Sequence, residues 1–351
     1  MSSPLSEYDY ELPESSIRKE PISPRDHARL FVYDTKSDTV TFDYFYNLAN
    51  FIPDNTGMVL NNTGVCPARV QFTKDTGGRV EGLILVNEGF GDDGTIAAIV
   101  DRQIIPGRKL MLGGYLFYIA RQDEQKFYLK PEFDSKLLPG ILEEFGATPT
   151  PPYLGKQSMP EHELRDRYQT IFARDRKSVA APTASLHFTT EVFESLHKKG
   201  VTKTEVTLDV GLGTFAEVKE EHVATKRLHT ETIFIGRESF AQIKKWKESG
   251  NPVLAVGTTA TRTLEAEADA LLYEVPHDIH TKTNLFIMKG DEFSIVDLML
   301  TNFHVPRSSL MALVDAFLNY KGAKKGIKEL YAIALKENFK FYSFGDAMLI
   351  L

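Results

Sequence analysis

The spacing of hydrophobic and polar positions divides this chain into two regions of different texture. Between Ala68 and Phe133, short apolar runs follow one another closely and are separated by turn residues. The pairs Gly77–Gly78 and Gly113–Gly114 stand where tight hairpin turns are needed. Closely spaced strands of this kind predict a small antiparallel β-barrel or sandwich.

Outside this stretch, helices and strands are predicted to alternate. An almost uninterrupted apolar run at Pro252–Val256 is typical of a strand covered on both faces of a sheet, and a further strand is expected at Leu285–Met288. Helices are predicted from Thr190 to Gly200, and from Ser239 as the N-cap to Gly250. Residues 1–25 are polar and rich in proline, which predicts an extended arm.

The pattern as a whole predicts an α/β fold with an insertion. We expect a main α/β catalytic domain formed by both ends of the chain, residues 1–66 and 150–351, and an inserted β-barrel domain of residues 67–149. The proline-rich segment Thr148–Tyr153 is a stiff connection that marks the second boundary.

Composition and charge narrow the class of protein. The 351 residues carry a net charge of −7 at pH 7, which argues against a general nucleic-acid-binding protein but leaves room for a local basic patch that reads one folded RNA. Cys66 is the single cysteine, so an internal disulfide and a cysteine-based zinc site are excluded. No signal peptide is recognisable, and no apolar run approaches the roughly 20 residues that cross a bilayer. We therefore expect a cytoplasmic protein with no membrane partner, and the sequence is compatible with a monomer.

The first candidate site lies between Ser178 and Phe215. It begins with small apolar residues broken by a proline, continues to Thr183, His187 and Phe188, and ends in a turn after a strand that contains Gly211, Gly213 and Thr214. Irregular backbone of this kind suits a pocket wall, and the exposed N–H groups of such a turn suit an anion. The alternative is a buried connection with one satisfied core histidine.

A second candidate follows the predicted strand 252–256. Gly257, Thr258 and Thr259 open an amphipathic helix that also carries Arg262. Free N–H groups at a helix start, hydroxyls and an arginine can bind a carboxylate or a phosphate. This segment is not a P-loop, because the Gly-Lys-Ser/Thr ending is missing. The alternative is a well-capped helix with Arg262 in solvent.

Two further segments carry polar groups. In the loop Thr301–Ser309, Asn302 and His304 can read a base or ribose edge, and Arg307 can pair with an anion. His229 and Glu231 are two residues apart on an extended segment and should face the same side, as a general acid–base pair would. A self-bonded loop and an exposed sheet face are the respective alternatives.

Taken together, ordered blocks of sequence along nearly the whole chain resemble the S-adenosylmethionine:tRNA ribosyltransferase-isomerase family of queuosine biosynthesis. The blocks are Tyr10–Glu14, Pro24–Leu30, Asn62–Thr63, Pro67–Arg69, Thr76–Gly78, Pro151–Tyr153, Arg167–Thr170, Ser178–Ala184, Leu186–Thr189, Val210–Phe215, Val256–Thr259, Arg262–Glu265, Thr301–His304 and Gly345–Ile350. The resemblance implies an α/β domain with an inserted β-barrel and no metal. It also implies transfer and isomerisation of the ribosyl moiety of S-adenosylmethionine, a co-substrate, onto 7-aminomethyl-7-deazaguanine at the wobble position of a tRNA anticodon loop. The implied products are epoxyqueuosine-tRNA, adenine and methionine.

The chemistry of that reaction assigns expected roles to the candidates. Proton carriers are needed to form a sulfonium ylide and to protonate the departing adenine, and the sulfonium favours aromatic faces or a carboxylate. The expected catalytic residues are His187, His229, Glu231 and His304. The expected substrate-binding residues are Thr183, Phe188, Gly211, Gly213, Thr214, Gly257, Thr258, Thr259, Arg262, Asn302, Phe303 and Arg307.

The sequence departs from the family pattern at four positions inside these blocks. They are Gly64 in place of an arginine, Ser185 in place of a glycine, Asp209 in place of a histidine and Lys226 in place of a histidine. These changes keep open the alternative of a divergent paralogue that uses S-adenosylmethionine on a non-tRNA acceptor. A further alternative is a non-catalytic protein that binds a nucleoside or RNA, against which the presence of His187, His229, Glu231 and His304 argues.

Overall fold

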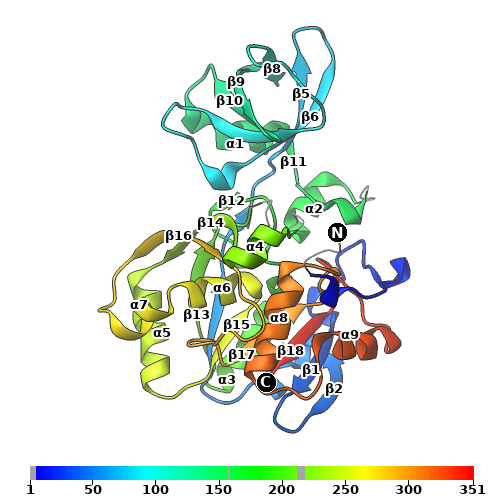
Figure 1. Ribbon diagram of the computed structural model, residues 1–351, viewed down its shortest axis with the longest axis vertical. Helices are drawn as coiled ribbons and strands as arrows, with labels where there is room; N and C mark the ends of the chain where they lie inside the picture. Colours follow the sequence, from blue (N-terminus) through cyan, green and yellow to red (C-terminus); the bar gives the residue numbers. More distant parts are fainter. Residues whose placement is uncertain (1–4, 156–158, 212–217) are drawn as a thin grey trace.

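The computed structural model describes residues 5–155, 159–211 and 218–351. Two sheets organise the chain: a large mixed sheet flanked by helices, and an antiparallel sheet that closes on itself at one end of the molecule (Figure 1). The predicted α/β fold with an inserted β-barrel is confirmed.

The large sheet has nine strands, and its middle is parallel. In spatial order the strands are β16 (Ile279–Leu285), β14 (Arg227–Ile235), β13 (Thr202–Leu208), β3 (Gly57–Asn61), β15 (Val253–Val256), β17 (Leu298–Asn302), β18 (Ala347–Ile350), β1 (Arg29–Asp34) and β2 (Thr39–Tyr44). Strands β13, β3, β15 and β17 run parallel, whereas β18 runs antiparallel to β17 and parallel to β1. The carboxyl ends of the parallel strands and the start of β18 therefore meet at one edge of the sheet.

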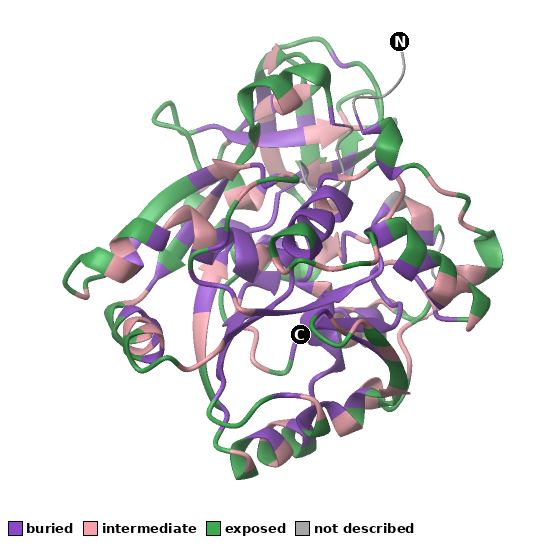
Figure 2. Ribbon diagram, turned by 60° about the horizontal axis from the view of Figure 1, so that its bottom comes forward, coloured by how far each residue is buried: buried purple, intermediate pink, exposed green. Residues whose placement is uncertain are grey.

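Alternation along the strands gives the sheet a hydrophobic core on each face. In β1, Phe31 and Tyr33 point into one core, and Leu30 and Val32 into the other. The first core is covered by helices α5 (Arg237–Glu248), α6 (Thr258–Ala266), α7 (Ala268–Tyr273), α8 (Ser309–Tyr320) and α9 (Ile327–Lys336). The second is covered by α3 (Thr190–Lys198) and the 3-10 helix η4 (Phe45–Asn50). Buried residues accordingly concentrate in the middle of the molecule, and the peripheral helices keep an exposed face (Figure 2).

The barrel is built from a continuous part of the chain. Its strands, in spatial order, are β5 (Arg69–Lys74), β6 (Arg79–Ile84), β7 (Ile96–Val100), β10 (Lys126–Pro131), β9 (Tyr115–Asp123) and β8 (Lys109–Leu112). Strand β8 pairs with β5 and closes the ring, and β11 (Gly146–Ala147) adds to β5. Leu138, Ile141 and Leu142 of helix α1 (Leu138–Phe145) pack into the barrel core.

Short elements join the two parts. Strands β4 (Gly64–Val65) and β12 (Arg176–Ser178) pair with each other beside the barrel, where helices α2 (Glu161–Arg167) and α4 (Glu220–Thr225) also lie (Figure 1).

Three local expectations differ from the structure. Helix α5 begins at Arg237, so Ser239 lies inside it and its hydroxyl donates to the carbonyl of Glu205. Strand β16 ends at Leu285, where the strand expected at 285–288 was to begin. The N-terminal segment is more than an extended arm, because Leu5 and Tyr8 are fully or almost fully buried.

Candidate active site

A cavity lies at the edge of the sheet where the parallel strands end. Its volume is about 500 Å³. Pockets of α/β sheets form at this edge because the loops that leave the carboxyl ends of neighbouring strands separate there. The lining residues are Tyr153, Ala180–Ala184, Val210, Gly257–Thr259, Thr301–Leu310, Tyr342 and Ser343.

The turn from β15 into α6 forms one wall of this cavity. Gly257 has φ +87° and ψ 157°, a conformation that other residues rarely adopt, and helix α6 begins at the next residue. No side chain caps the start of α6. The N–H groups of its first turn and the hydroxyls of Thr258 and Thr259 are therefore suited to an anionic group of a ligand.

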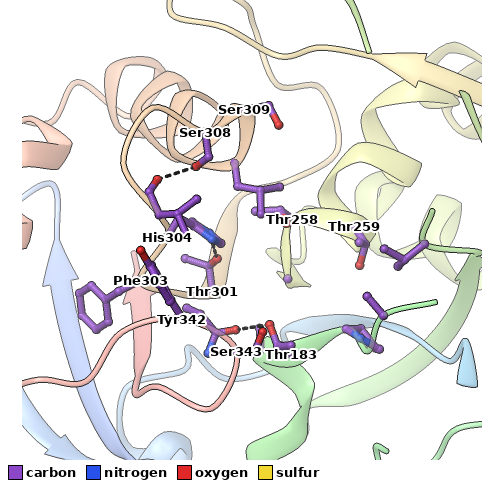
Figure 3. Close-up of a pocket in the computed structure, with 18 of the residues that line it drawn as sticks. Thr183, Thr258, Thr259, Thr301, Phe303, His304, Ser308, Ser309, Tyr342 and Ser343 are labelled. Carbon is purple, nitrogen blue, oxygen red and sulfur yellow. Dashed lines mark hydrogen bonds between the residues drawn. The ribbon is translucent and has the colours of Figure 1, made fainter. Parts of the chain in front are cut away.

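His304 lies on the opposite wall and is held firmly (Figure 3). Its backbone N–H donates to the Tyr331 hydroxyl over 2.9 Å, and its carbonyl accepts from the Tyr10 hydroxyl over 2.5 Å. The Thr301 hydroxyl lies 2.9 Å from the ring atom Nε2. Burial lowers the pKa of His304 to about 3, so the imidazole is neutral near pH 7 and can both donate and accept a hydrogen bond.

At the floor of the cavity, the side-chain amide of Asn302 links three segments of the chain. The Thr183 hydroxyl donates to Oδ1 of Asn302 over 2.8 Å, and Nδ2 of Asn302 lies 3.4 Å from the carbonyl oxygen of Asp346. The Asp346 carboxylate is fully buried and accepts from the backbone N–H groups of Arg29 and Lys340 and from the Arg18 side chain. Asn302 therefore helps to hold the segments around Thr183 and Asp346 in place, and it also lines the cavity.

Two aromatic residues that the sequence analysis did not select also line the cavity. Tyr153 and Tyr342 have ring centroids 4.4 Å apart, and the Tyr153 hydroxyl is hydrogen-bonded to Ser343. Burial raises the pKa of Tyr153 to about 12, so its phenol stays protonated. Tyr342 (φ +73°) and Arg307 (φ +55°) both have left-handed backbone, which is uncommon outside glycine and often marks functional loops. Tyr153 belongs to the block Pro151–Tyr153 that resembles the family, and this membership could have marked it as a candidate site residue.

Some of the candidate residues named from the sequence line the main cavity, and others do not. The cavity brings together Thr183, Gly257, Thr258, Thr259, Asn302, Phe303, His304 and Arg307. Phe188 is fully buried in the core under α3, where it stacks on Phe193. Gly213 and Thr214 lie outside the described residues.

Glu231 and Arg262 form a buried ion pair outside the cavity lining. The Glu231 carboxylate also accepts from the backbone N–H of Gly211 over 3.1 Å, and Nε of Arg262 donates to the carbonyl of Leu285. His229 is exposed on β14, and its pKa is lowered by partial burial and by the neighbouring His222. These three side chains are therefore not among the described residues that line the cavity with His304.

His187 lines a second, smaller cavity instead of the main one. Its Nδ1 lies 3.3 Å from the carbonyl oxygen of Arg25, and burial is the main cause that lowers its pKa to about 4. Ser343 lines both cavities, so they adjoin.

The four departures from the family pattern are absent from the cavity lining. Asp209 is buried, accepts from the Thr63 hydroxyl over 2.9 Å, and has a pKa that burial raises. Lys226 pairs with Asp291, Gly64 packs against the chain at Arg174–Arg176, and Ser185 is fully buried.

Comparisons with known proteins identify the family. A family model described as queuosine biosynthesis protein matches residues 5–350. The chain belongs to this family. It is 38% identical over 360 residues to the S-adenosylmethionine:tRNA ribosyltransferase-isomerase of Fusobacterium nucleatum, covering 100% of this chain and 97% of that protein. It is 39% identical over 350 residues to the protein of the same name from Aquifex aeolicus, covering 99% of both.

A solved structure agrees with this assignment. The crystal structure of S-adenosylmethionine tRNA ribosyltransferase from Thermotoga maritima covers 99% of this chain and 100% of its own, with 30% identity and a TM-score of 0.55. The family resemblance seen in the sequence is confirmed, and the chain is an enzyme of this family, a transferase and isomerase.

Two further observations bear on partners. Within residues 5–155, 159–211 and 218–351, no group of three or more His, Cys, Asp or Glu side chains is placed to hold a metal ion. In the same residues, no helix has the length and apolar character needed to cross a membrane.

Proposed function

We propose that this enzyme transfers and isomerises the ribosyl moiety of S-adenosylmethionine onto 7-aminomethyl-7-deazaguanine at the wobble position of a tRNA. The family and the names of its relatives support the reaction class. The observation that carries the proposal is the placement of a neutral, half-buried imidazole, His304, across one cavity from the uncapped start of α6.

The reaction is redox-neutral and needs no metal. A C5′ proton next to the sulfonium is removed, the glycosidic bond to adenine breaks with a proton delivered to the purine, and the bond from C5′ to sulfur breaks to release methionine. A new bond joins the ribosyl carbon skeleton to the aminomethyl nitrogen of the deazaguanine, and the ring rearranges to an epoxycyclopentane. Each proton transfer requires a group that reaches the cavity in the right state at working pH: unprotonated to remove the C5′ proton, and protonated to deliver a proton to the purine.

Groups that line the cavity suit the proton transfers, the methionine carboxylate and the purine. His304 is the proposed proton carrier, because among the expected catalytic residues it alone lines the described cavity. The start of α6, with Thr258 and Thr259, is the proposed site for the methionine carboxylate. Tyr153 and Tyr342 offer aromatic faces to a purine or to the unstacked wobble base.

The proposed partner is therefore a tRNA anticodon loop, and the proposed location is the cytoplasm. The alternative of a divergent paralogue with a non-tRNA acceptor rested on the departures at Gly64, Ser185, Asp209 and Lys226. All four lie outside the cavity lining, which favours the tRNA reaction.

The test is a turnover assay with two acceptors. Purified protein is incubated with S-adenosylmethionine and either a tRNA carrying the deazaguanine or the free modified nucleoside. We expect adenine and methionine in equal amounts and a mass increase of the tRNA. Adenine release with the nucleoside and not with the tRNA would establish the paralogue instead. No adenine with either acceptor at high enzyme concentration would refute both.

A further inference from the structure

A second cavity, of about 210 Å³, adjoins the main one and has no role in the reaction described above. Four segments far apart in sequence meet there: the chain before β1, the end of α2, the 3-10 helix η8 (Thr183–His187), and the loop before β18. Ser343 separates it from the main cavity and lines both. Its lining residues are Pro21, Ile22, Ser23, Arg25, Arg167, Leu186, His187, Ser343 and Phe344.

The charge of this second cavity is positive. It is lined by two arginines, Arg25 and Arg167, and no acidic side chain is among its described lining residues. Arg25 is half-buried, and its guanidinium forms no ion pair within the described part of the chain. The guanidinium donates a hydrogen bond to the carbonyl of Gln169 over 3.0 Å. Burial, and then the charge of Arg167, lower the pKa of Arg25. A guanidinium that is withdrawn from water without a carboxylate is unfavourable unless an anion binds to it.

The positive charge around the second cavity also affects the pKa of His187. After burial, the charges of Arg18 and Arg25 contribute to the lowered pKa of its imidazole. The side chain is 3% exposed, and its Nε2 has no hydrogen-bond partner among the described residues. Arg18 is already neutralised by Asp346 over 3.1 Å, and Arg167 pairs with the partly exposed Glu163 of its own helix over 2.9 Å. Of these three arginines, Arg25 is therefore the one that has no acidic partner among the described residues.

We propose that the second cavity binds a phosphodiester group of the RNA chain, next to the nucleotide whose base occupies the main cavity. This inference rests on the proposed function. Two guanidinium groups suit phosphate oxygens, since each can donate two parallel hydrogen bonds. A phosphate follows every nucleotide, so a cavity that touches the base-binding cavity at Ser343 is placed for a neighbouring phosphate.

The carboxylate of the methionine moiety is a less suitable occupant. The main cavity already offers that group the start of α6, with Thr258 and Thr259. Arg25 and Arg167 instead line the second cavity, whose described lining includes no residue of α6. The expected contribution of the two arginines is therefore to RNA affinity and not to co-substrate affinity.

The test compares the affinity of two ligands in charge-neutral variants. The RNA is an anticodon hairpin that carries the deazaguanine, bound without S-adenosylmethionine so that no turnover occurs; S-adenosylmethionine is titrated separately. In Arg25→Gln/Arg167→Gln we expect the hairpin to bind about tenfold more weakly or worse at low salt. The slope of log affinity against log salt should become shallower by about 1 to 2, because one or two phosphate contacts are lost. The Kd of S-adenosylmethionine should change by less than about twofold.

Matched variants make the result specific. Arg237→Gln, the control for the single variant Arg167→Gln, removes one arginine charge at the start of α5. This exposed residue follows β14, which lies near the edge of the large sheet opposite to β1, and the change should leave the affinity for the hairpin unchanged. Arg167→Gln alone leaves the bond from Arg25 to Gln169 in place, and should show part of the loss if the double variant folds poorly.

The outcomes separate the two proposals. If the wild-type protein does not bind the hairpin, the proposed function is wrong and this inference falls with it. If the wild-type protein binds the hairpin and Arg25→Gln/Arg167→Gln binds it equally well, only the phosphate site is wrong. Weaker binding of S-adenosylmethionine in that variant would also overturn the inference, because it would place the methionine carboxylate in the second cavity.

Discussion

The hydroxyl of Thr301 is hydrogen-bonded to Nε2 of His304 at the wall of the main cavity, with 2.9 Å between the two atoms. Thr301 is the penultimate residue of β17 and is 1% exposed, so its own position is fixed by the sheet. The backbone of His304 is fixed separately by Tyr10 and Tyr331. The orientation of the ring therefore depends on Thr301, and so does the direction in which it moves a proton.

The first prediction tests this dependence. Thr301→Val keeps the volume of the side chain and removes the hydroxyl. We expect kcat for adenine release to fall about tenfold with little change in KM, because a misoriented imidazole loses part of the gain from general acid–base catalysis. Thr301→Ser, which keeps the hydroxyl, should recover most of the activity. An unchanged kcat in Thr301→Val would mean that the His304 ring takes no part in the slow step.

The second prediction concerns the turn at the start of α6. Gly257→Ala places a side chain at φ +87°, although the new Cβ would meet Ala184 and the Thr259 hydroxyl only at ordinary distances of 3.6 Å and 3.8 Å. We expect the free energy of unfolding to fall by about 1–3 kcal/mol from backbone strain, and KM for S-adenosylmethionine to rise as the turn moves. Gly250→Ala is the matched control, since Gly250 has φ +71° and open space around it, far from the cavity. An equal rise of KM in both variants would exclude the turn as a binding site.

The third prediction is a pH dependence of stability that arises from His187. The pKa of this imidazole is about 4 in the folded protein, below the value of about 6.5 expected in the unfolded chain. As the pH falls below 6.5, the unfolded state takes up a proton that the folded state refuses, so stability is lost. Linkage gives a loss of about 2 kcal/mol between pH 8 and pH 5 from this group. It should disappear from the pH profile of denaturant unfolding in His187→Phe and persist in His197→Gln, which alters an exposed histidine. Identical profiles for wild type and His187→Phe would contradict the burial argument.

The fourth prediction separates structural from catalytic roles at Glu231. Glu231→Gln leaves the Arg262 guanidinium buried without its counter-charge. We expect a loss of about 3 kcal/mol in the free energy of unfolding, with kcat of the folded protein within about threefold of wild type. Glu248→Gln, at a solvent-exposed pair with Lys244, should change stability by less than about 1 kcal/mol. A hundredfold loss of kcat at unchanged stability would instead make Glu231 a catalytic residue.

The fold was predictable where the hydrophobic pattern is decisive. The strand at 252–256 and the hairpin glycines of the barrel were predicted from local composition. In the structure β15 covers Val253–Val256, and turns are found at both glycine pairs. The loop Thr301–Ser309 and the turn at Gly257 were predictable for the same reason, since each joins a buried strand to a helix. At the end of this loop Ser308 caps α8, and its hydroxyl accepts from the backbone N–H of Met311.

The positions of individual side chains were less predictable, because they depend on tertiary packing. Alternation placed His229 and Glu231 on one side of a strand, but pairing between β14 and β16 is irregular between Arg227 and Glu231, and only Glu231 is buried. His187 follows Thr183 closely in sequence, yet η8 turns it into a different cavity. No sequence spacing encodes the bond from Tyr10 to His304, which joins residues 294 positions apart.

The place of β18 in the sheet has a consequence for how the protein is made. Residues 347–350 form the strand that links β17 to β1, so the hairpin of β1 and β2 has no connection to the rest of the sheet until those residues leave the ribosome. The barrel strands, in contrast, are contiguous in sequence and can close while translation continues. An emerging chain should therefore carry a finished barrel beside exposed N-terminal strands, and chaperones that shield apolar strands are expected to bind it at that stage.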